Sequence, residues 1–337
     1  MNLVTGATGI LGSHVVLKLL QNNKPVIACK QKNSDLKKIA KLFSYYTKDD
    51  KDLFQKIEWR DIDVCDIFSI EQALEGISNV YHCAGFVSFN KKDRNKLFKI
   101  NESGTSNLLA ACMHKKINGF CHVSSIATIN NLDYKEALHE NVFWKTSGKE
   151  SDYALSKYNA EREVWRAIEE GLNAIIVNPG VILSPGFWNQ SSSKLFGMCY
   201  KGNKFYTDGL AGYISATDTA SIMVELMDKK QFANRYILVE GNYTFKQIFD
   251  MILSNFGKQK TTVKAGRTIL QMGRFFDYIS SKITSKDQIL SGAIVNAALN
   301  EQTFLNSKIK ETLHFKFTPI SHQINEICRF FKEDRMV

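Results

Sequence analysis

Short apolar runs separated by polar stretches divide the first half of the chain into regular segments. Six runs are only a few residues long and mostly apolar, which predicts strands buried on both faces of a sheet. They lie at 3–5, 25–29, 57–59, 79–83, 120–124 and 173–177. Between them, apolar residues recur at helical spacing, which predicts helices. These helices cover 14–20, 35–48, 69–74, 100–116 and 151–170. Ser69 is expected to cap the helix at 69–74.

Because strands and helices alternate, the pattern predicts an α/β fold with a doubly wound parallel sheet covered by helices on both faces. We expect residues 1–180 to form this sheet domain, and a segment at about 210–240, with a strand at 235–239, to return to it. The remainder, 181–337, is predicted to be a small mixed, mainly helical substrate-binding region. Ligands of such sheets bind at the carboxyl ends of the strands, so functional residues are expected there.

The C-terminal region is predicted to contain helices at 243–256, 265–283 and 287–299. The second of these has apolar residues at positions 269, 272, 276, 279 and 283, all on one helical face. A helix packed on the core of the substrate region explains this face, and a helix lying on a membrane surface is the alternative. No run approaches the ~18 apolar residues of a membrane span. A strand that starts at residue 3 leaves no room for a signal peptide.

Composition adds limits on partners and compartment. The net charge of +10 is spread along the chain and comes mostly from lysine, without a helix-turn-helix or aromatic-interleaved basic motif. We therefore expect no nucleic-acid partner, although a basic surface attracts anionic small molecules. The seven cysteines are scattered and show no Cys-x-x-Cys pair, which indicates reduced thiols and a cytoplasmic protein. No histidine has metal-ligand spacing with cysteine or carboxylate, so no metal is predicted.

Three glycines, Gly6, Gly9 and Gly12, follow the first strand at intervals of three residues and lead into a helix. A strand, a glycine turn and a helix N-terminus together make a binding site for a pyrophosphate. Gly6 would make the tight turn, Gly9 would clear space for the phosphates, and Gly12 would let the helix pack closely on the strand. A glycine-rich turn without a ligand is the plainer alternative.

Candidate acid–base chemistry lies in the helix at 151–170. Tyr153 and Lys157 are four residues apart and share one helical face. An ammonium beside a phenol lowers the pKa of the tyrosine, which then exchanges a proton near neutral pH. The same spacing also arises by chance in helices. Ser124 and Ser125 end the fifth predicted strand, where a serine hydroxyl polarises a carbonyl or is an ordinary strand-end group.

Together these stretches resemble the extended short-chain dehydrogenase/reductases, also called the NAD-dependent epimerase/dehydratase superfamily. The similar segments span nearly the whole chain: 5–12, 82–85, 101–105 with Asn107, 123–125, Tyr153 with Lys157, 178–180, 213–218, 306–308 and 315–319. Residues 82–89 and 177–188 look most like the dihydroflavonol-4-reductase and 3β-hydroxysteroid dehydrogenase branch. Ser184 stands where this branch usually has glycine, and Gln31 where its reductases have arginine.

The resemblance implies a Rossmann domain, an NAD(P) cofactor and a Ser-Tyr-Lys centre. Tyr153 would be the general acid/base, Lys157 would hold the nicotinamide ribose, and Ser125, the second serine of the pair, would orient the reacting oxygen. Asn101 would support a proton-relay water. The implied cofactor contacts are Gly6, Thr8, Gly9, Ile10, Leu11, Lys30, Gln31, Lys32, Lys38, Asp63, Val64, Cys83, Ala84, Gly85, Val123, Tyr153, Lys157, Pro179, Gly180, Val181 and Ile182.

Within this set, Asp63 and Val64 would reach the adenine, and Pro179 and Gly180 would pack beside the nicotinamide. Cofactor choice depends on the end of the second strand, where an acid binds the ribose 2′-OH of NAD. This chain has Gln31 there, flanked by lysines and with no carboxylate expected nearby. The sequence therefore predicts that NADP is preferred over NAD.

The predicted function is an NADPH-dependent ketone or aldehyde reductase, or the reverse alcohol dehydrogenase. A sugar-nucleotide epimerase or dehydratase is the alternative, although its Tyr-Gly-Pro block after the sixth strand is absent. A non-catalytic NADP-binding sensor is the second alternative. The C-terminal half offers aromatic residues that suit a flat or apolar substrate or form ordinary core: Phe187, Trp188, Phe196, Tyr200, Phe205, Tyr206 and Tyr213. The sequence leaves a homodimer open.

Overall fold

A computed structural model describes residues 1–47, 50–129, 136–148, 150–284 and 291–336. Its centre is a sheet of seven parallel strands in the order β10-β6-β5-β4-β1-β2-β3. The strands are β1 (Asn2–Thr5), β2 (Val26–Lys30), β3 (Glu58–Asp61), β4 (Asn79–His82), β5 (Gly119–Val123), β6 (Ala174–Pro179) and β10 (Asn234–Leu238). The six strands predicted in the first half are all present, and the expected Rossmann-type sheet is confirmed.

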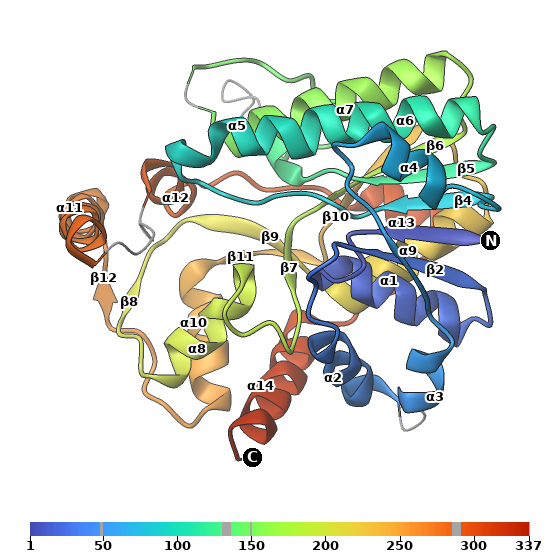
Figure 1. The fold of residues 1–337 in the computed structure, drawn as a ribbon. Coiled ribbons are helices and arrows are strands. Elements are labelled where there is room, and N and C mark those ends of the chain that lie inside the picture. The colour runs from blue at the N-terminus through green and yellow to red at the C-terminus, as the bar shows by residue number, and fades with distance from the viewer. Residues whose placement is uncertain (48–49, 130–135, 149, 285–290, 337) are drawn as a thin grey trace.

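Helices cover both faces of this sheet (Figure 1). One face carries α1 (Ile10–Gln21) packed against α9 (Ala216–Asp228), with α2 (Lys37–Tyr46) and α3 (Asp50–Gln55) beside them. The other carries α4 (Ile67–Ala73), α6 (Gly104–His114) and α7 (Asp152–Glu169). The strands are continuously apolar because each face is buried under helices.

Two local predictions need correction. The helix expected at 100–116 is two pieces, a π-helical segment η2 (Phe98–Ser103) and then α6, and a short helix α5 (Arg94–Leu97) precedes them directly. The wider turn at η2 holds Asn101, a residue of the candidate site. Helix α4 is capped by Asp66, whose carboxylate accepts from the Phe68 N–H, and not by Ser69. Ser69 instead accepts a hydrogen bond from the backbone N–H of Asp63.

The chain returns to the main sheet after residue 210, through α9 and the edge strand β10. The C-terminal region also builds a three-stranded sheet from β7 (Val181–Leu183), β9 (Leu210–Ser215) and β11 (Gly241–Thr244). The short strands β8 (Phe205–Tyr206) and β12 (Val263–Lys264) pair beside it. The strands β7, β8, β9, β11 and β12 were not predicted. Strands β7, β8 and β12 have only two or three residues, and β9 and β11 contain a glycine that interrupts the apolar pattern.

The remaining helices are mostly C-terminal. They are α8 (Lys194–Tyr200), α10 (Phe245–Asn255), α11 (Arg267–Thr284), α12 (Gly292–Ala297), α13 (Ser307–Leu313) and α14 (Ile320–Met336), with the short turns η1 (Lys91–Asp93), η3 (Ile126–Thr128) and η4 (Ser191–Ser193). Helix α14 packs on α10 and shares an apolar core with α8. Residues 287–290 of the helix predicted at 287–299 lie outside the described residues.

Helix α11 lies at the periphery of the molecule (Figure 1). Ile269 is 44% exposed and Met272 is 56% exposed, so the expected core contact is wrong for these two residues. Positions 276, 279 and 283 lie outside the residues whose side chains the structure describes. Among the helices that the structure describes, none is both long enough and apolar enough to cross a bilayer.

Candidate active site

The turn after β1 brings backbone N–H groups to the carboxyl edge of the sheet. Gly6 has a φ of +63°, and a Cβ there would lie 2.6 Å from the backbone nitrogen of Ala84. A Cβ at Gly12 would lie 2.2 Å from the carbonyl oxygen of Gly6, so α1 packs as closely as glycine allows. The N-cap of α1 is Gly9, which offers no side chain to the first N–H groups of the helix. Helix N-termini of this kind are common binding places for anions.

A pocket opens at this edge, where the strand order reverses between β1 and β4. It is lined by Leu11, Cys83, Gly85, Phe86, Val87, Val123, Ser124, Ser125, Tyr153, Lys157, Pro179, Gly180 and Ile182. Three of the predicted catalytic residues thus meet the strand-end residues at one place. The predicted residues outside this lining are Gly6, Thr8, Gly9, Ile10, Lys30, Gln31, Lys32, Lys38, Asp63, Val64, Ala84, Asn101 and Val181.

Tyr153 lies in the first turn of α7, which begins where the Ser151 hydroxyl accepts a hydrogen bond from the backbone N–H of Ala154. Its ring packs edge-on against Phe89, with 5.6 Å between the ring centroids. Burial raises the pKa of Tyr153, while a hydrogen bond from Ser125 opposes the rise. The expectation that Lys157 lowers this pKa is therefore wrong for this arrangement, in which the ammonium is directed elsewhere.

Lys157 is only 5% exposed, and its Nζ donates to the carbonyl oxygen of Val123 over 2.6 Å. A Cβ at Gly85 would lie 3.7 Å from this Nζ, so the ammonium lies close beside the backbone of the loop after β4. Burial lowers the pKa of Lys157 to about 8, and the carboxylate of Glu161 opposes that fall. The ammonium therefore loses its proton within a readily measured pH range.

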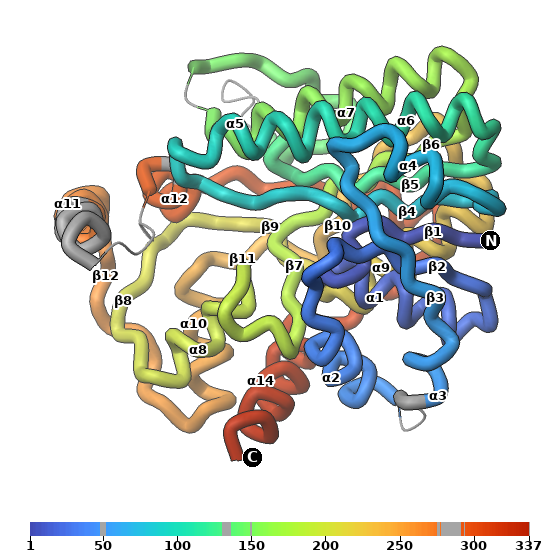
Figure 2. Tube along the Cα trace, in the orientation of Figure 1, coloured from blue at the N-terminus to red at the C-terminus, as the bar shows by residue number. Residues whose placement is uncertain are grey.

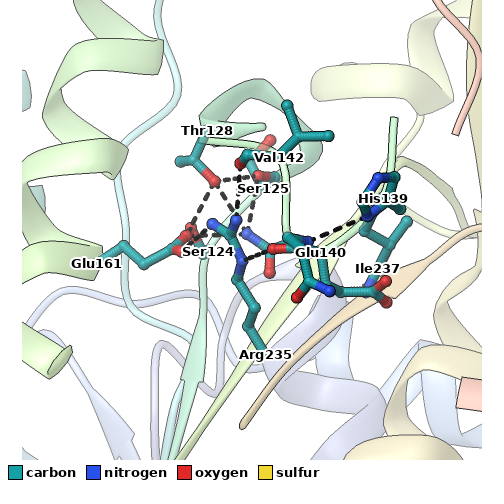
Figure 3. A network of polar contacts seen from close by, with 11 residues as sticks. Ser124, Ser125, Thr128, His139, Glu140, Val142, Glu161, Arg235 and Ile237 are labelled. Carbon is teal, nitrogen blue, oxygen red and sulfur yellow. Dashed lines mark hydrogen bonds and ion pairs between the residues drawn. The ribbon is translucent and has the colours of Figure 1, made fainter. Parts of the chain in front are cut away.

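The two strand-end serines have different partners. The Ser124 hydroxyl is buried and donates to the Glu161 carboxylate over 2.7 Å (Figure 3). Ser125 lines the pocket together with Tyr153, and its hydroxyl accepts the Ala127 N–H over 3.1 Å. Both serines line the pocket, and the Ser124 hydroxyl is already bonded to Glu161.

Asn101 connects the loop after β4 to helix α7 through its side-chain amide. Its side-chain oxygen accepts the Phe86 N–H over 2.7 Å, and its amide donates to the Phe86 carbonyl over 2.9 Å. The same amide donates to the Ser156 hydroxyl over 3.0 Å. These bonds fix the loop after β4 to helix α7. A role for Asn101 in proton relay stays a prediction.

The residues expected near the adenine are held by their own loop. The Asp63 carboxylate accepts the backbone N–H of Cys65 over 2.9 Å, and Val64 packs against Gly104. Both lie beyond the end of β3, on the same edge of the sheet as the glycine turn. Contact with a cofactor base at this place stays a prediction.

The end of β2 differs from the expectation in one respect. Lys30 pairs with Asp61 at the end of the neighbouring strand, with 2.6 Å between Nζ and Oδ1. The prediction that no carboxylate lies nearby is therefore wrong, because strand pairing brings in an acid from 31 positions along the chain. Gln31, Lys32 and Lys38 are exposed.

Comparison with known proteins defines the family. A family model described as "NAD dependent epimerase/dehydratase family" matches residues 2–238. The chain belongs to this family. The resemblance to extended short-chain dehydrogenase/reductases is thereby confirmed.

Two relatives and one solved structure illustrate the range of the family. The chain is 28% identical over 254 residues to "Sterol demethylase protein B" of Methylococcus capsulatus, covering 74% of this chain and 73% of that protein. It is 28% identical to the "Bifunctional dihydroflavonol 4-reductase/flavanone 4-reductase" of Malus domestica, covering 54% of each. The chain thus spans about half the length of that reductase. A Thermus thermophilus UDP-glucose 4-epimerase in complex with NAD has the same fold, with a TM-score of 0.74, 17% identity and 98% coverage of each chain.

In this epimerase/dehydratase family member, the aromatic residues of the C-terminal half do not line the pocket. Phe187, Phe196 and Tyr213 are buried in apolar cores, which makes the ordinary core interpretation correct for them. The pocket is instead walled by Leu11, Phe86, Val87 and others from the sheet domain, and by Ile182 of β7. Sequence reasoning missed Phe86, Val87 and Phe89, although the apolar run just after the fourth strand was a usable signal.

Proposed function

We propose that this protein is an NAD(P)(H)-dependent oxidoreductase that reduces a ketone or aldehyde, or oxidises the corresponding alcohol. The observation that carries the proposal is that Ser125, Tyr153 and Lys157 line one pocket. This pocket lies at the carboxyl edge of the sheet, beside the glycine turn. That is where a dinucleotide binds in doubly wound folds.

The residues present fit a dinucleotide. The uncapped N-terminus of α1 offers N–H groups to the pyrophosphate, and no Cβ intrudes at Gly6 or Gly12. The nicotinamide supplies the hydride chemistry when bound. Ser125 orients the carbonyl oxygen of the substrate, and the Tyr153 Oη transfers the proton. Because burial raises its pKa, Tyr153 is protonated at neutral pH and is ready to act as an acid in the reductive direction.

For the cofactor, we propose that NADP is preferred over NAD. Lys30, Lys32 and Lys38 supply positive charge at the end of β2, and Gln31 offers no carboxylate to a ribose 2′-OH. The pairing of Lys30 with Asp61 weakens this preference, because that ammonium is already partly neutralised. The preference is therefore expected at about tenfold.

We propose an apolar or aromatic carbonyl substrate. The pocket has an apolar wall, which is formed by Leu11, Phe86, Val87 and Ile182. Val87 is 53% exposed. Relatives named for sterol and flavonoid chemistry agree with this class. The seven cysteines are all free thiols, which supports a reducing compartment such as the cytoplasm. A homodimer stays a prediction.

A sugar-nucleotide epimerase or dehydratase is the second candidate. The description of the matching family and the shared fold of the Thermus epimerase support it. The absence of the Tyr-Gly-Pro block after β6 favours the reductase. Purified protein that carries tightly bound NAD and is protected from unfolding by UDP- or GDP-sugars would reverse this ranking.

The proposal is tested by measuring hydride transfer from NADPH to a panel of apolar ketones and aldehydes. The loss of NADPH absorbance reports the rate. Tyr153→Phe removes only the phenolic oxygen, so kcat is expected to fall by about 10²–10⁴-fold while cofactor affinity stays unchanged. Tyr158→Phe is the matched control, because Tyr158 lies on the same helix and stacks on Trp144 outside the pocket. Unchanged turnover in Tyr153→Phe would remove the proposed acid.

A further inference from the structure

A buried carboxylate lies directly behind the two strand-end serines. Glu161 is 3% exposed and sits on α7 four residues after Lys157 and eight after Tyr153, so the three share one helical face. Unlike the other two, Glu161 does not line the pocket. Figure 3 shows its side chain between Ser124, Thr128 and Arg235. Because burying a carboxylate is costly unless it is paired and hydrogen-bonded, the partners of Glu161 need to be identified.

One oxygen of Glu161 organises the segment that carries Ser125. Its Oε2 accepts hydrogen bonds from Ser124 Oγ over 2.7 Å, Thr128 Oγ1 over 2.9 Å and Asn178 Nδ2 over 2.9 Å. These donors come from the end of β5, from η3 and from β6. Thr128 Oγ1 also lies 2.8 Å from the carbonyl oxygen of Ser125, so its one hydrogen is shared between the two acceptors, and Asn178 Nδ2 donates to that carbonyl over 3.2 Å. Thr128 and Asn178 therefore connect the backbone of Ser125 to the carboxylate of Glu161.

The other oxygen is anchored by an ion pair. Glu161 Oε1 lies 3.1 Å from Arg235 Nη1, which reaches in from the edge strand β10. The same guanidinium donates to the backbone carbonyls of Glu140 over 2.6 Å and Val142 over 2.9 Å. These bonds fix the guanidinium, so the carboxylate cannot turn away from the serine segment (Figure 3).

Several ionisable groups surround Lys157 and differ in charge. His82 faces it from β4, Cys83 from the position just after β4, His122 from β5, and Tyr153 and Glu161 from its own helix. Burial keeps both histidines neutral and raises the pKa of the Cys83 thiol to about 12. Within the described part of the chain, Glu161 is thus the carboxylate that acts on this ammonium at neutral pH.

We infer that Glu161 is a positioning residue of the active site, which holds the segment carrying Ser125 and stabilises the ammonium of Lys157 from one helical turn away. The part that concerns turnover rests on the proposed oxidoreductase function. The part that concerns Lys157 does not, since the charge of that ammonium can be measured without a substrate.

Glu161→Gln keeps the size of the side chain and removes its charge. Labelling the lysines with ¹³C at Cε allows the titration of Lys157 to be followed by NMR. The Lys157 signal is assigned as the one that is missing from the spectrum of the Lys157→Met variant. Wild-type Lys157 is expected to titrate near pH 8, and Lys157 of Glu161→Gln at least about one pH unit lower. The alkaline limb of kcat/KM moves down by the same shift, and kcat falls about tenfold because Ser125 is less well held.

Matched variants separate charge from position. Glu163→Gln removes a half-exposed carboxylate from the same helix and should leave the titration and kcat as in wild type. Ser124→Ala removes one donor while keeping the charge, so kcat falls and the Lys157 titration does not move. If Glu161→Gln does not fold, Glu161→Asp keeps the charge on a shorter side chain, and it should behave as Ser124→Ala does.

A Lys157 titration in Glu161→Gln that matches wild type, or unchanged kcat in Ser124→Ala and Glu161→Asp, overturns the inference. Absence of hydride transfer in the wild-type protein is a different result. It contradicts the proposed function and leaves the NMR comparison to decide the effect of Glu161 on Lys157.

Discussion

Lys30 illustrates how a single neighbour changes what a residue can do. By its position at the end of β2, it is a candidate partner for a ribose 2′-phosphate. Parallel pairing sets Lys30 opposite Asp61 on β3, and the two form an ion pair. Both side chains are partly exposed, so solvent screens the ion pair. A phosphate can therefore replace the Asp61 carboxylate as the partner of Lys30.

Substitutions at this strand end should move cofactor preference in opposite directions. Gln31→Asp adds an acceptor for a 2′-OH and repels a phosphate, so it should abolish or invert the roughly tenfold preference for NADP. Asp61→Asn frees Lys30 and should raise that preference by a few-fold. Fluorescence titrations with NADPH and NADH at two ionic strengths measure both effects. Equal binding of NADP and NAD by the wild-type protein at low salt would contradict the NADP proposal.

At the scale of the element, the first helix depends on one close contact. Gly12 lies in the first turn of α1, where a Cβ would meet the Gly6 carbonyl oxygen at 2.2 Å. No side chain can relieve this overlap, because both partners are backbone. The glycine is required by packing, whether or not a phosphate binds.

Gly12→Ala is expected to lower the free energy of unfolding by more than about 2 kcal/mol, because the helix must move away from the turn. Gly197→Ala provides the control, since Gly197 lies within α8 and a Cβ there meets nothing within 4 Å. That change should stabilise the protein by about 0.4–1 kcal/mol. Urea unfolding of both variants checks the pair of signs, and a stable Gly12→Ala would refute the packing argument.

At the scale of the whole molecule, buried histidines link stability to pH. His14, His82 and His122 are buried, and burial lowers the pKa of His14 to about 4 and that of His82 to about 3. The pKa of His122 is also lowered well below its ordinary value. Neither ring nitrogen of His122 has a hydrogen-bond partner in the part of the chain that the structure describes.

The sign of the pH effect follows from these lowered pKa values. Above pH 6.5 the three histidines are neutral in both states, and below it only the unfolded chain takes up their protons. Stability should therefore fall as the pH is lowered from about 6.5 toward 4, by about 1 kcal/mol per pH unit for each histidine.

His122→Leu isolates one of these contributions. It removes two buried nitrogens without partners, so we expect a gain of about 1–3 kcal/mol at pH 7.5. The loss of stability between pH 6.5 and 5 should also become smaller by one histidine's share. Urea unfolding at several pH values gives both quantities, with the exposed His322→Gln as the control. An unchanged pH slope in His122→Leu would contradict the assignment.

The two parts of the molecule are joined through the last helix. In Figure 2, α14 runs beside α2, and Asp334 near its end accepts hydrogen bonds from Tyr45 of α2 and from Trp188 Nε1 in the loop after β7. Tyr45 also stacks on Phe330, with 4.4 Å between the ring centroids. These contacts connect residues nearly 290 positions apart, which no local pattern indicates.

The order of strands and helices in the first half, the glycine turn and the Tyr153–Lys157 face follow from the sequence alone. Each depends on residues within a few positions of one another, whose spacing directly sets which way they point. Ser125 could be chosen over Ser124 only by resemblance, and the bond from Ser124 to Glu161 became visible only in the structure.

Tertiary structure decided what depends on contacts between distant segments. It brought Asp61 to Lys30, buried Phe196 and Tyr213 in the core, and set Phe86 and Val87 against the pocket. It raised the pKa of Tyr153 where local spacing had suggested a fall, because burial acts through the whole surrounding fold. Glu161 was not singled out by its sequence position. Its meaning comes from Arg235, Ser124 and Asn178, which only the folded sheet brings together.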